Sequence, residues 1–255
     1  MARGLRIGFL LFVLLTVAVG TWQARSRTTS WDRALDVVVF PISGDGRPAT
    51  AAYLRTLGED SVASIETFMR REAGHYGVGV TTPVDVHLGP EVVHRPPALP
   101  STPTMLGAIV WTLKMRWWAW RHGEHPVLRP DVKIFAVYYD PELTKRVAHS
   151  VGLQKGLVGV ANLFAFERMT EENNVIIAHE LLHTLGATDK YDPASTLPQF
   201  PHGYAEPELD PLYPQRYAEI MGGRIPLSES RADAPANLEA VLVGARTAQE
   251  IRWLR

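Results

Sequence analysis

The spacing of five residues between positions 179 and 189 constrains this chain more than any other feature. His179 and His183 are four residues apart, so on a helix they project from the same face, one turn apart. Two imidazoles at this spacing can bind one zinc ion, while Glu180 lies beside the ion without being a ligand. Gly186 is suited to end the helix, because glycine adopts the left-handed conformation at little cost. The turn that follows would bring Asp189 within reach as a third protein ligand.

The residues before this stretch predict a helix over 170–185. Thr170 is suited to the N-cap position, and Glu171 and Glu172 place negative charge in the first turn, where the helix dipole favours it. Three protein ligands would leave one position of a tetrahedral zinc ion to water. This is the arrangement of a catalytic rather than a structural zinc site.

The pattern His-Glu-x-x-His-x-x-Gly-x-x-Asp resembles the signature of the metzincin zinc peptidases, in the snapalysin-like variant with aspartate as third ligand. Residues 219–223 (EIMGG) resemble the Met-turn that follows the ligands in that family. The resemblance implies a zinc-dependent metalloendopeptidase that hydrolyses peptide bonds with a zinc-activated water molecule. It implies that Zn²⁺ is held by His179, His183 and Asp189, that Glu180 is the general base, and that Met221 forms an apolar floor beneath the ligands.

Two other functions fit the same residues. One is a zinc amide hydrolase that acts on non-protein substrates such as cell-wall peptides. The other is a non-catalytic, membrane-associated protein that binds zinc for structure. The intact Glu180 and the three predicted ligands favour an enzyme, because a structural zinc site normally has a fourth protein ligand.

The proline-rich stretch between 189 and 221 is long for a connection without secondary structure, which predicts one wall of a substrate cleft. It contains three rival third ligands, which are Asp192, His202 and Glu206. It also contains three candidates to hydrogen-bond an oxyanion, which are Tyr191, Tyr204 and Tyr217.

Apolar, β-branched runs predict strands over 35–42, 84–88, 132–139 and 157–166, with a helix over 60–76 between the first two. A strand, a helix and a second strand in this order indicate an α/β fold. The metzincin resemblance implies a twisted, mostly parallel sheet, an active-site helix and an irregular lower subdomain. It also implies that strand 157–166 binds extended peptide through its edge. A glycine-containing loop is expected over 150–156, and a short C-terminal helix with a capping box between Thr247 and Glu250.

A proline-rich linker (90–103) precedes a second helical pattern, at 104–121, which is apolar on almost every side. It contains four tryptophans, which are Trp111, Trp117, Trp118 and Trp120, together with three basic residues. Two interpretations remain open. The helix could pack on the sheet with its tryptophans in the core, or it could lie at a membrane surface.

The chain begins with an apolar run over 7–22, flanked by arginines on both sides. Its length suits a signal-anchor or the apolar part of a cleaved signal peptide. We therefore expect residues 1–30 to contain an apolar helix and a linker, and residues 31–255 to form the catalytic domain. This predicts a membrane-anchored protein with an extracytoplasmic (periplasmic or cell-surface) domain, or a secreted one if the signal is cleaved.

Composition excludes several other functions. The chain has 255 residues, a net charge of −1 and no cysteine, so disulfides and thiolate ligands are excluded. Without a basic excess, nucleic acid is not expected as a partner; the expected partners are a peptide or protein substrate and the membrane. The remaining histidines lack ligand spacing and are expected to be structural or exposed; they are His75, His87, His94, His122, His125 and His149.

Overall fold

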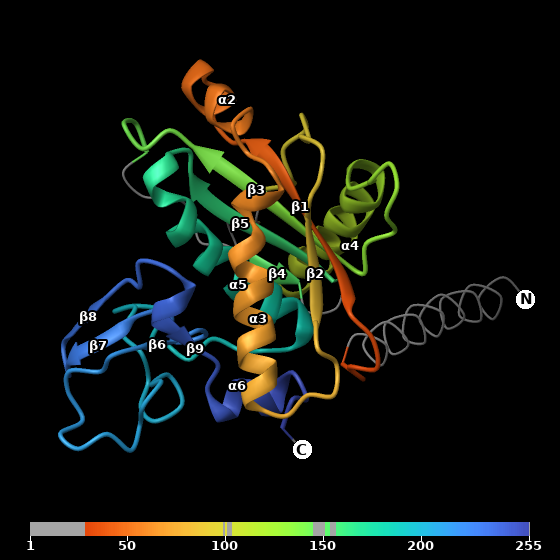
Figure 1. The fold of residues 1–255 in the computed structure, drawn as a ribbon. Coiled ribbons are helices and arrows are strands. Elements are labelled where there is room, and N and C mark those ends of the chain that lie inside the picture. Colours follow the sequence, from red (N-terminus) through yellow and green to blue (C-terminus); the bar gives the residue numbers. More distant parts are fainter. Residues whose placement is uncertain (1–28, 99, 101–103, 145–150, 154–156, 255) are drawn as a thin grey trace, which may run out of the picture.

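A five-stranded sheet forms the centre of the computed structural model, which describes residues 29–98, 100, 104–144, 151–153 and 157–254 (Figure 1). The strand order is β2-β1-β3-β5-β4, and all neighbouring pairs are parallel except β4 with β5. The strands are β1 (Leu35–Ser43), β2 (Val84–Leu88), β3 (Val132–Tyr139), β4 (Val151–Leu153) and β5 (Val158–Phe164). The predicted α/β class and the four predicted strands are confirmed.

Helices cover both faces of this sheet. Two of them, α3 (Ala63–His75) and α5 (Thr170–Leu185), pack on one face, and α4 (Met105–His122) packs on the other (Figure 1). Two shorter helices, α2 (Pro48–Leu54) and α6 (Ala245–Glu250), lie at opposite ends of the molecule in this view. Short 3₁₀ turns precede α3 and α5 and follow β8, at Glu59–Ser61, Glu167–Met169 and Leu238–Ala240.

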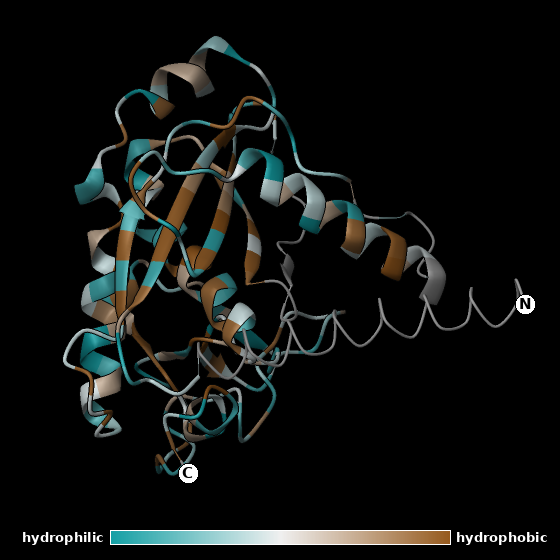
Figure 2. Cartoon of the chain, turned by 90° about the vertical axis from the view of Figure 1, so that its right-hand side faces the viewer, coloured by the Kyte–Doolittle hydropathy of each residue, from teal (hydrophilic) through white to brown (hydrophobic). Residues whose placement is uncertain are grey.

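The amino-acid pattern of β1 explains why the sheet is covered on both sides. Leu35, Val37 and Val39 belong to the core shared with α3 and α5, whereas Val38 and Phe40 belong to the core shared with α4. Strands of a parallel sheet that is buried on both faces consist of continuous apolar residues rather than alternating ones. Figure 2 shows the strands mostly in brown, as apolar segments interrupted by a few hydrophilic residues.

The fourth strand corrects two expectations. A loop was expected over 150–156, but Val151–Leu153 forms β4 and pairs antiparallel with β5. Glycine and serine weaken strand propensity, but backbone pairing with β5 outweighs that preference here. Strand β5 therefore pairs with β3 along its whole length and with β4 at residues 158–160, so the outermost strand on this side of the sheet is β4.

The lower part of the molecule, after α5, is irregular as expected, and small sheets hold it together. Strand β6 (Ala218–Glu219) pairs with β9 (Val241–Leu242), and β7 (Ile225–Ser228) pairs with β8 (Arg231–Asp233). The β7–β8 hairpin was not predicted, because its polar sequence lacks the apolar alternation by which strands are recognised.

The predicted N-terminal apolar helix lies in 1–28, outside the described residues. Within the part of the chain that the structure describes, no helix combines the length and apolar character needed to span a bilayer.

Gly159 leaves room for the side chain of Ile134 on the neighbouring strand β3. A Cβ atom there would lie 2.7 Å from Cδ1 of Ile134 and 3.5 Å from Cβ of Glu180. We expect Gly159→Val to lower the free energy of unfolding by about 1–3 kcal/mol, because overpacking forces neighbouring atoms apart. Gly58→Val is the control, since no atom lies within 4 Å of the position that a Cβ atom would occupy there. Urea unfolding would measure both, and equal stability of Gly159→Val and wild type would contradict this packing.

Candidate metal centre

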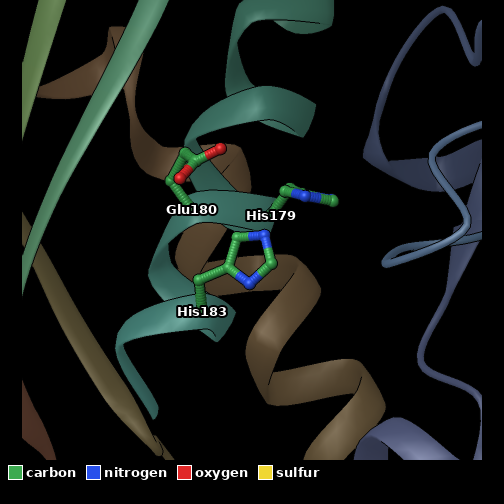
Figure 3. A group of neighbouring side chains, drawn as sticks. All are labelled: His179, Glu180 and His183. Atoms are coloured by element: carbon green, nitrogen blue, oxygen red, sulfur yellow. The ribbon is translucent and has the colours of Figure 1, made fainter. Parts of the chain in front are cut away.

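Helix α5 carries His179, Glu180 and His183, and Figure 3 shows the two imidazoles close together on adjacent turns. The helix ends at Gly186, which has a left-handed φ of 116°, as predicted.

The predicted N-cap of α5 is wrong. The residue before the helix is Met169, and the Thr170 hydroxyl instead hydrogen-bonds to the Tyr53 hydroxyl, 3.1 Å away. That bond ties the start of α5 to α2.

The turn after Gly186 brings Asp189 to both imidazoles. Its Oδ1 atom lies 3.1 Å from Nε2 of His179 and 3.1 Å from Nε2 of His183. Ligands of a tetrahedral zinc ion with bonds near 2.0–2.1 Å are separated by about 3.3 Å. The Asp189 oxygen therefore lies at about the distance from each Nε2 atom that separates two ligands of one zinc ion. The Asp189 side chain is 43% exposed, so this side of the group opens to solvent.

Backbone carbonyls orient both imidazoles. Nδ1 of His179 donates to the carbonyl of Ile220 at 2.8 Å, and Nδ1 of His183 donates to that of Ala187 at 2.9 Å. A carbonyl only accepts hydrogen bonds, so Nδ1 carries the proton in both rings. In neutral rings each Nε2 then presents a lone pair toward Asp189, which is the tautomer that a metal ligand requires.

Two imidazole lone pairs and a carboxylate oxygen at this spacing repel one another unless a cation lies among them. Burial opposes ionisation of Asp189, but the two imidazoles hold the pKa of its carboxyl well below its usual range. Burial likewise lowers the pKa of His179, but Asp189, Glu180 and the Ile220 carbonyl together raise it above its usual value. The two shifts have one cause, because a protonated imidazole and the Asp189 carboxylate stabilise each other.

Glu180 is buried next to this group, with 3% of its surface exposed. Its Oε2 atom has no hydrogen-bond partner within the described residues, and burial raises the pKa of its carboxyl. Buried carboxylate oxygens are normally hydrogen-bonded, so an unpaired one indicates a partner such as a water molecule or substrate. One ligand atom from each of His179, Glu180 and His183 lies within 4.8 Å of the other two, which is compatible with a metal ion.

The turn at 219–223 lies directly beneath His179, because the carbonyl that orients this ring belongs to Ile220. Met221 is fully buried in the core shared with α5. Glu219, for which the sequence suggested no role, anchors the turn. It is fully buried, and its oxygens accept four hydrogen bonds, from the amides of Met221, Gly222 and Gly244 and from the Thr247 hydroxyl. Burial raises the pKa of Glu219, and the hydrogen bonds from Thr247, Gly244 and Gly222 limit this rise.

Helix α6 also fixes the segment that carries Asp189. Glu250 accepts hydrogen bonds from the Thr188 amide at 3.0 Å, the Thr188 hydroxyl at 2.9 Å and Nζ of the buried Lys190 at 2.8 Å. The Lys190 amide in turn donates to the carbonyl of Met221. The predicted capping box between Thr247 and Glu250 is therefore wrong, because both side chains bind the loops around the candidate metal group. Sequence reasoning missed Lys190, since nothing local distinguishes it from a surface lysine.

The three tyrosine candidates lie in different surroundings. Tyr191 lies beside the group: its ring is 6.4 Å from that of His179, and a hydrogen bond links its side chain to Asp189. Burial and the nearby carboxylates raise the pKa of Tyr191 to about 12. The hydroxyl of Tyr204 is instead bound to that of Tyr213 at 2.7 Å, and the Arg216 guanidinium lies over the ring of Tyr217.

The rival third ligands have other roles. Asp192 accepts hydrogen bonds from Ala194 and Ser195 within its own turn. Glu206 forms an ion pair with Arg216, and His202 lines a cavity of about 600 Å³ that does not include the candidate ligands. Asp189 is the acidic residue that reaches both imidazoles.

Among the other histidines, His94 and His122 stack on each other, as expected of structural residues, and His149 lies outside the described residues. His87 is partly exposed, in agreement with the expectation. It forms a second group with Asp36 and Asp85, close enough to share a cation. These residues come together only because β1 and β2 pair in register. All three are partly exposed, and Arg33 lies 4.0 Å from Asp36.

Comparison with models of known protein families finds none that matches this chain, and comparison with curated proteins finds no match either.

Removal of Asp189 should weaken metal binding. We expect Asp189→Ala to lower the affinity for Zn²⁺ at least about 100-fold, because the loss of residues that only support metal ligands already costs 10–100-fold. The measurement is competition with a chromophoric chelator after the protein has been stripped of metal. Asp192→Ala is the matched control in the same loop and should bind as wild type does. Equal affinity of the two variants would remove Asp189 from the ligand set.

The Lys190–Glu250 pair should make stability depend on pH. Burial opposes ionisation, but Lys190 and Thr188 hold the pKa of Glu250 below its usual value of 4.5. A carboxyl whose pKa is lowered by folding stabilises the protein above its unfolded pKa, and this contribution is lost as the pH falls through the folded pKa. We expect Glu250→Gln to cost about 1–3 kcal/mol at pH 7 and less below about pH 4.5. Urea unfolding of both proteins from pH 7 to pH 3 tests this, and a difference independent of pH would contradict it.

Proposed function

We propose that this protein is a zinc-dependent metalloendopeptidase of metzincin type. The observation that carries the proposal is a carboxylate oxygen of Asp189 that lies 3.1 Å from each of two Nε2 atoms, beside a buried glutamate with an unpaired oxygen. The residues fit zinc, which prefers nitrogen and oxygen ligands in tetrahedral geometry. Zinc, when bound, lowers the pKa of a coordinated water molecule toward neutrality and polarises a substrate carbonyl.

The role of Glu180 distinguishes catalysis from structural metal binding. A structural site would use a fourth protein ligand, whereas Glu180 offers an unpaired oxygen next to three candidate ligands. Its carboxylate would take a proton from the attacking water and deliver it to the amide nitrogen as the C–N bond breaks. Burial raises the pKa of Glu180, which favours the uptake of a proton by its carboxylate.

The other residues position the reaction. His179 and His183 are held by backbone carbonyls, so their Nε2 atoms do not rotate away from the centre. With a pKa of about 12, Tyr191 keeps its proton at neutral pH and can donate a hydrogen bond to the oxyanion that forms at the scissile carbonyl. Met221 and Glu219 keep the turn beneath His179 in place.

The substrate we propose is a peptide in extended conformation. The metzincin resemblance predicted that the strand before the helix would bind peptide, but residues 158–160 of β5 already pair with β4 on the side away from β3. The same role is available to β4, whose outer edge can pair with a peptide backbone. We further propose that the apolar N-terminal stretch anchors the enzyme in a membrane with its catalytic domain on the extracytoplasmic side.

Substitution of the proposed base tests the reaction. We expect Glu180→Gln to lower kcat/KM for casein-type and cell-wall peptide substrates by a factor of about 10²–10⁴, the contribution typical of general acid–base catalysis. Because Glu180 is not proposed as a ligand, metal content should stay equal to that of wild type. Glu171→Gln, an exposed glutamate in the first turn of the same helix, is the matched control and should retain activity.

Three outcomes are informative. Cleavage of cell-wall peptides but not of casein would favour an amide hydrolase on non-protein substrates. No cleavage by metal-loaded wild type would favour a non-catalytic zinc-binding protein. Full activity of Glu180→Gln at equal metal content would reject Glu180 as the base.

A further inference from the structure

Helix α4 has two apolar faces, and only one of them is packed against the protein. Trp111, Met115, Trp118 and Ala119 are buried against the sheet, with Trp118 in edge contact with Phe135 at 4.6 Å. The core interpretation is thus confirmed for two of the four tryptophans. The opposite face consists of exposed apolar residues, which are Ile109 (52% exposed), Val110 (42%), Leu113 (57%), Trp117 (64%) and Trp120 (66%).

These exposed residues form one continuous stripe. With 3.6 residues per turn, positions 109, 113, 117 and 120 lie on the same side of the helix, with 110 at its border. In Figure 2, where α4 lies in front of the sheet, its apolar turns extend beyond the strands. Isolated exposed apolar residues are ordinary, but a contiguous patch that includes two tryptophans indicates an interaction site.

The charges around the stripe identify its partner. Lys114 and Arg121 lie along one border of the stripe and Arg116 along the other, and all three are exposed. The helix contains no acidic residue. Tryptophan favours the boundary between lipid head groups and acyl chains, and lysine or arginine beside an apolar face binds anionic head groups.

The same charges disfavour a second copy of this chain as the partner. Two such faces would bring at least six positive charges together with no acidic residue from either helix to neutralise them. The surface of an anionic bilayer satisfies both requirements at once, because it accepts the apolar stripe and neutralises the basic borders.

We propose that α4 docks flat on an anionic phospholipid surface through its exposed stripe. The two histidines of the candidate metal group lie on α5, which packs on the other face of the sheet. Docking of α4 therefore leaves the candidate metal group accessible. The interface interpretation then holds for Trp117 and Trp120, while Trp111 and Trp118 remain in the core. This inference does not depend on the proposed catalytic activity.

The absence of cysteine in the chain permits a site-specific test on the full-length protein. A single Leu113→Cys variant, labelled with an environment-sensitive fluorophore, is reconstituted in phosphatidylcholine vesicles with phosphatidylglycerol and brominated acyl chains. We expect the emission to shift to shorter wavelength and to be quenched by bromine. The control is Ser230→Cys in the β7–β8 turn, which an N-terminal anchor would bring equally near the vesicle but which should remain in water.

A second arm tests the charges. In the labelled protein, Lys114→Gln with Arg121→Gln should lower the docked-to-undocked ratio about fivefold for each charge removed, because each basic residue near an anionic surface contributes about that factor. The matched double variant Arg55→Gln with Arg231→Gln removes two exposed charges outside α4 and should not change the ratio.

Two results would overturn the proposal. If the label at 113 remains in water in anionic vesicles, α4 does not dock. If its emission is shifted but bromine does not quench it, protein rather than lipid covers the stripe. Dependence of that shift on protein concentration would then identify a second copy, and independence would identify residues 1–28 of the same chain.

Discussion

Electrostatic repulsion among three atoms sets the main constraint on this structure. Oδ1 of Asp189 lies 3.1 Å from Nε2 of His179 and 3.1 Å from Nε2 of His183, and each of the three atoms presents a lone pair when the rings are neutral. The backbone carbonyls of Ile220 and Ala187 prevent the rings from turning away. Such an arrangement is stable only with positive charge at its centre, and the rest of the lower subdomain holds it in place against that repulsion.

The supports of this centre come from distant parts of the chain. Helix α6 fixes the Asp189 segment through Glu250 and fixes the turn beneath His179 through Thr247 and Glu219. The indole nitrogen of Trp31 donates to the carbonyl of Ile251, 220 residues away in sequence, and so ties α6 to the start of the first strand. Buried polar networks of this kind cost stability when one member is removed, which makes them effective at fixing a single geometry.

The sheet separates the molecule into two functional sides. Helix α5 packs closely on one face, where Glu180 lies next to Gly159 of β5. Helix α4 covers the other face with half of its apolar surface and leaves the other half exposed. A helix with a single binding partner needs only one apolar stripe, so the second stripe of α4 indicates a second partner.

The sequence by itself determined the elements whose causes are local. Continuous β-branched runs predicted β1, β2, β3 and β5, and Gly186 predicted the end of α5 because few other residues adopt its left-handed conformation cheaply. The four-residue spacing of His179 and His183 predicted that both rings project from one face of the helix, because an α-helix has 3.6 residues per turn. The turn after Gly186 made Asp189 a candidate ligand. The distance of Asp189 from the two rings could not be predicted from the sequence.

Only the tertiary structure decided the rest. Glu250 and Thr247 match a capping box locally, yet in three dimensions their side chains bind Thr188, Lys190 and Glu219 instead. Likewise, four tryptophans in one helix could not be divided into buried and exposed pairs until α4 was placed against β3. Local sequence fixes backbone conformation through short-range sterics, whereas the partner of a polar or aromatic side chain depends on which distant segments meet it.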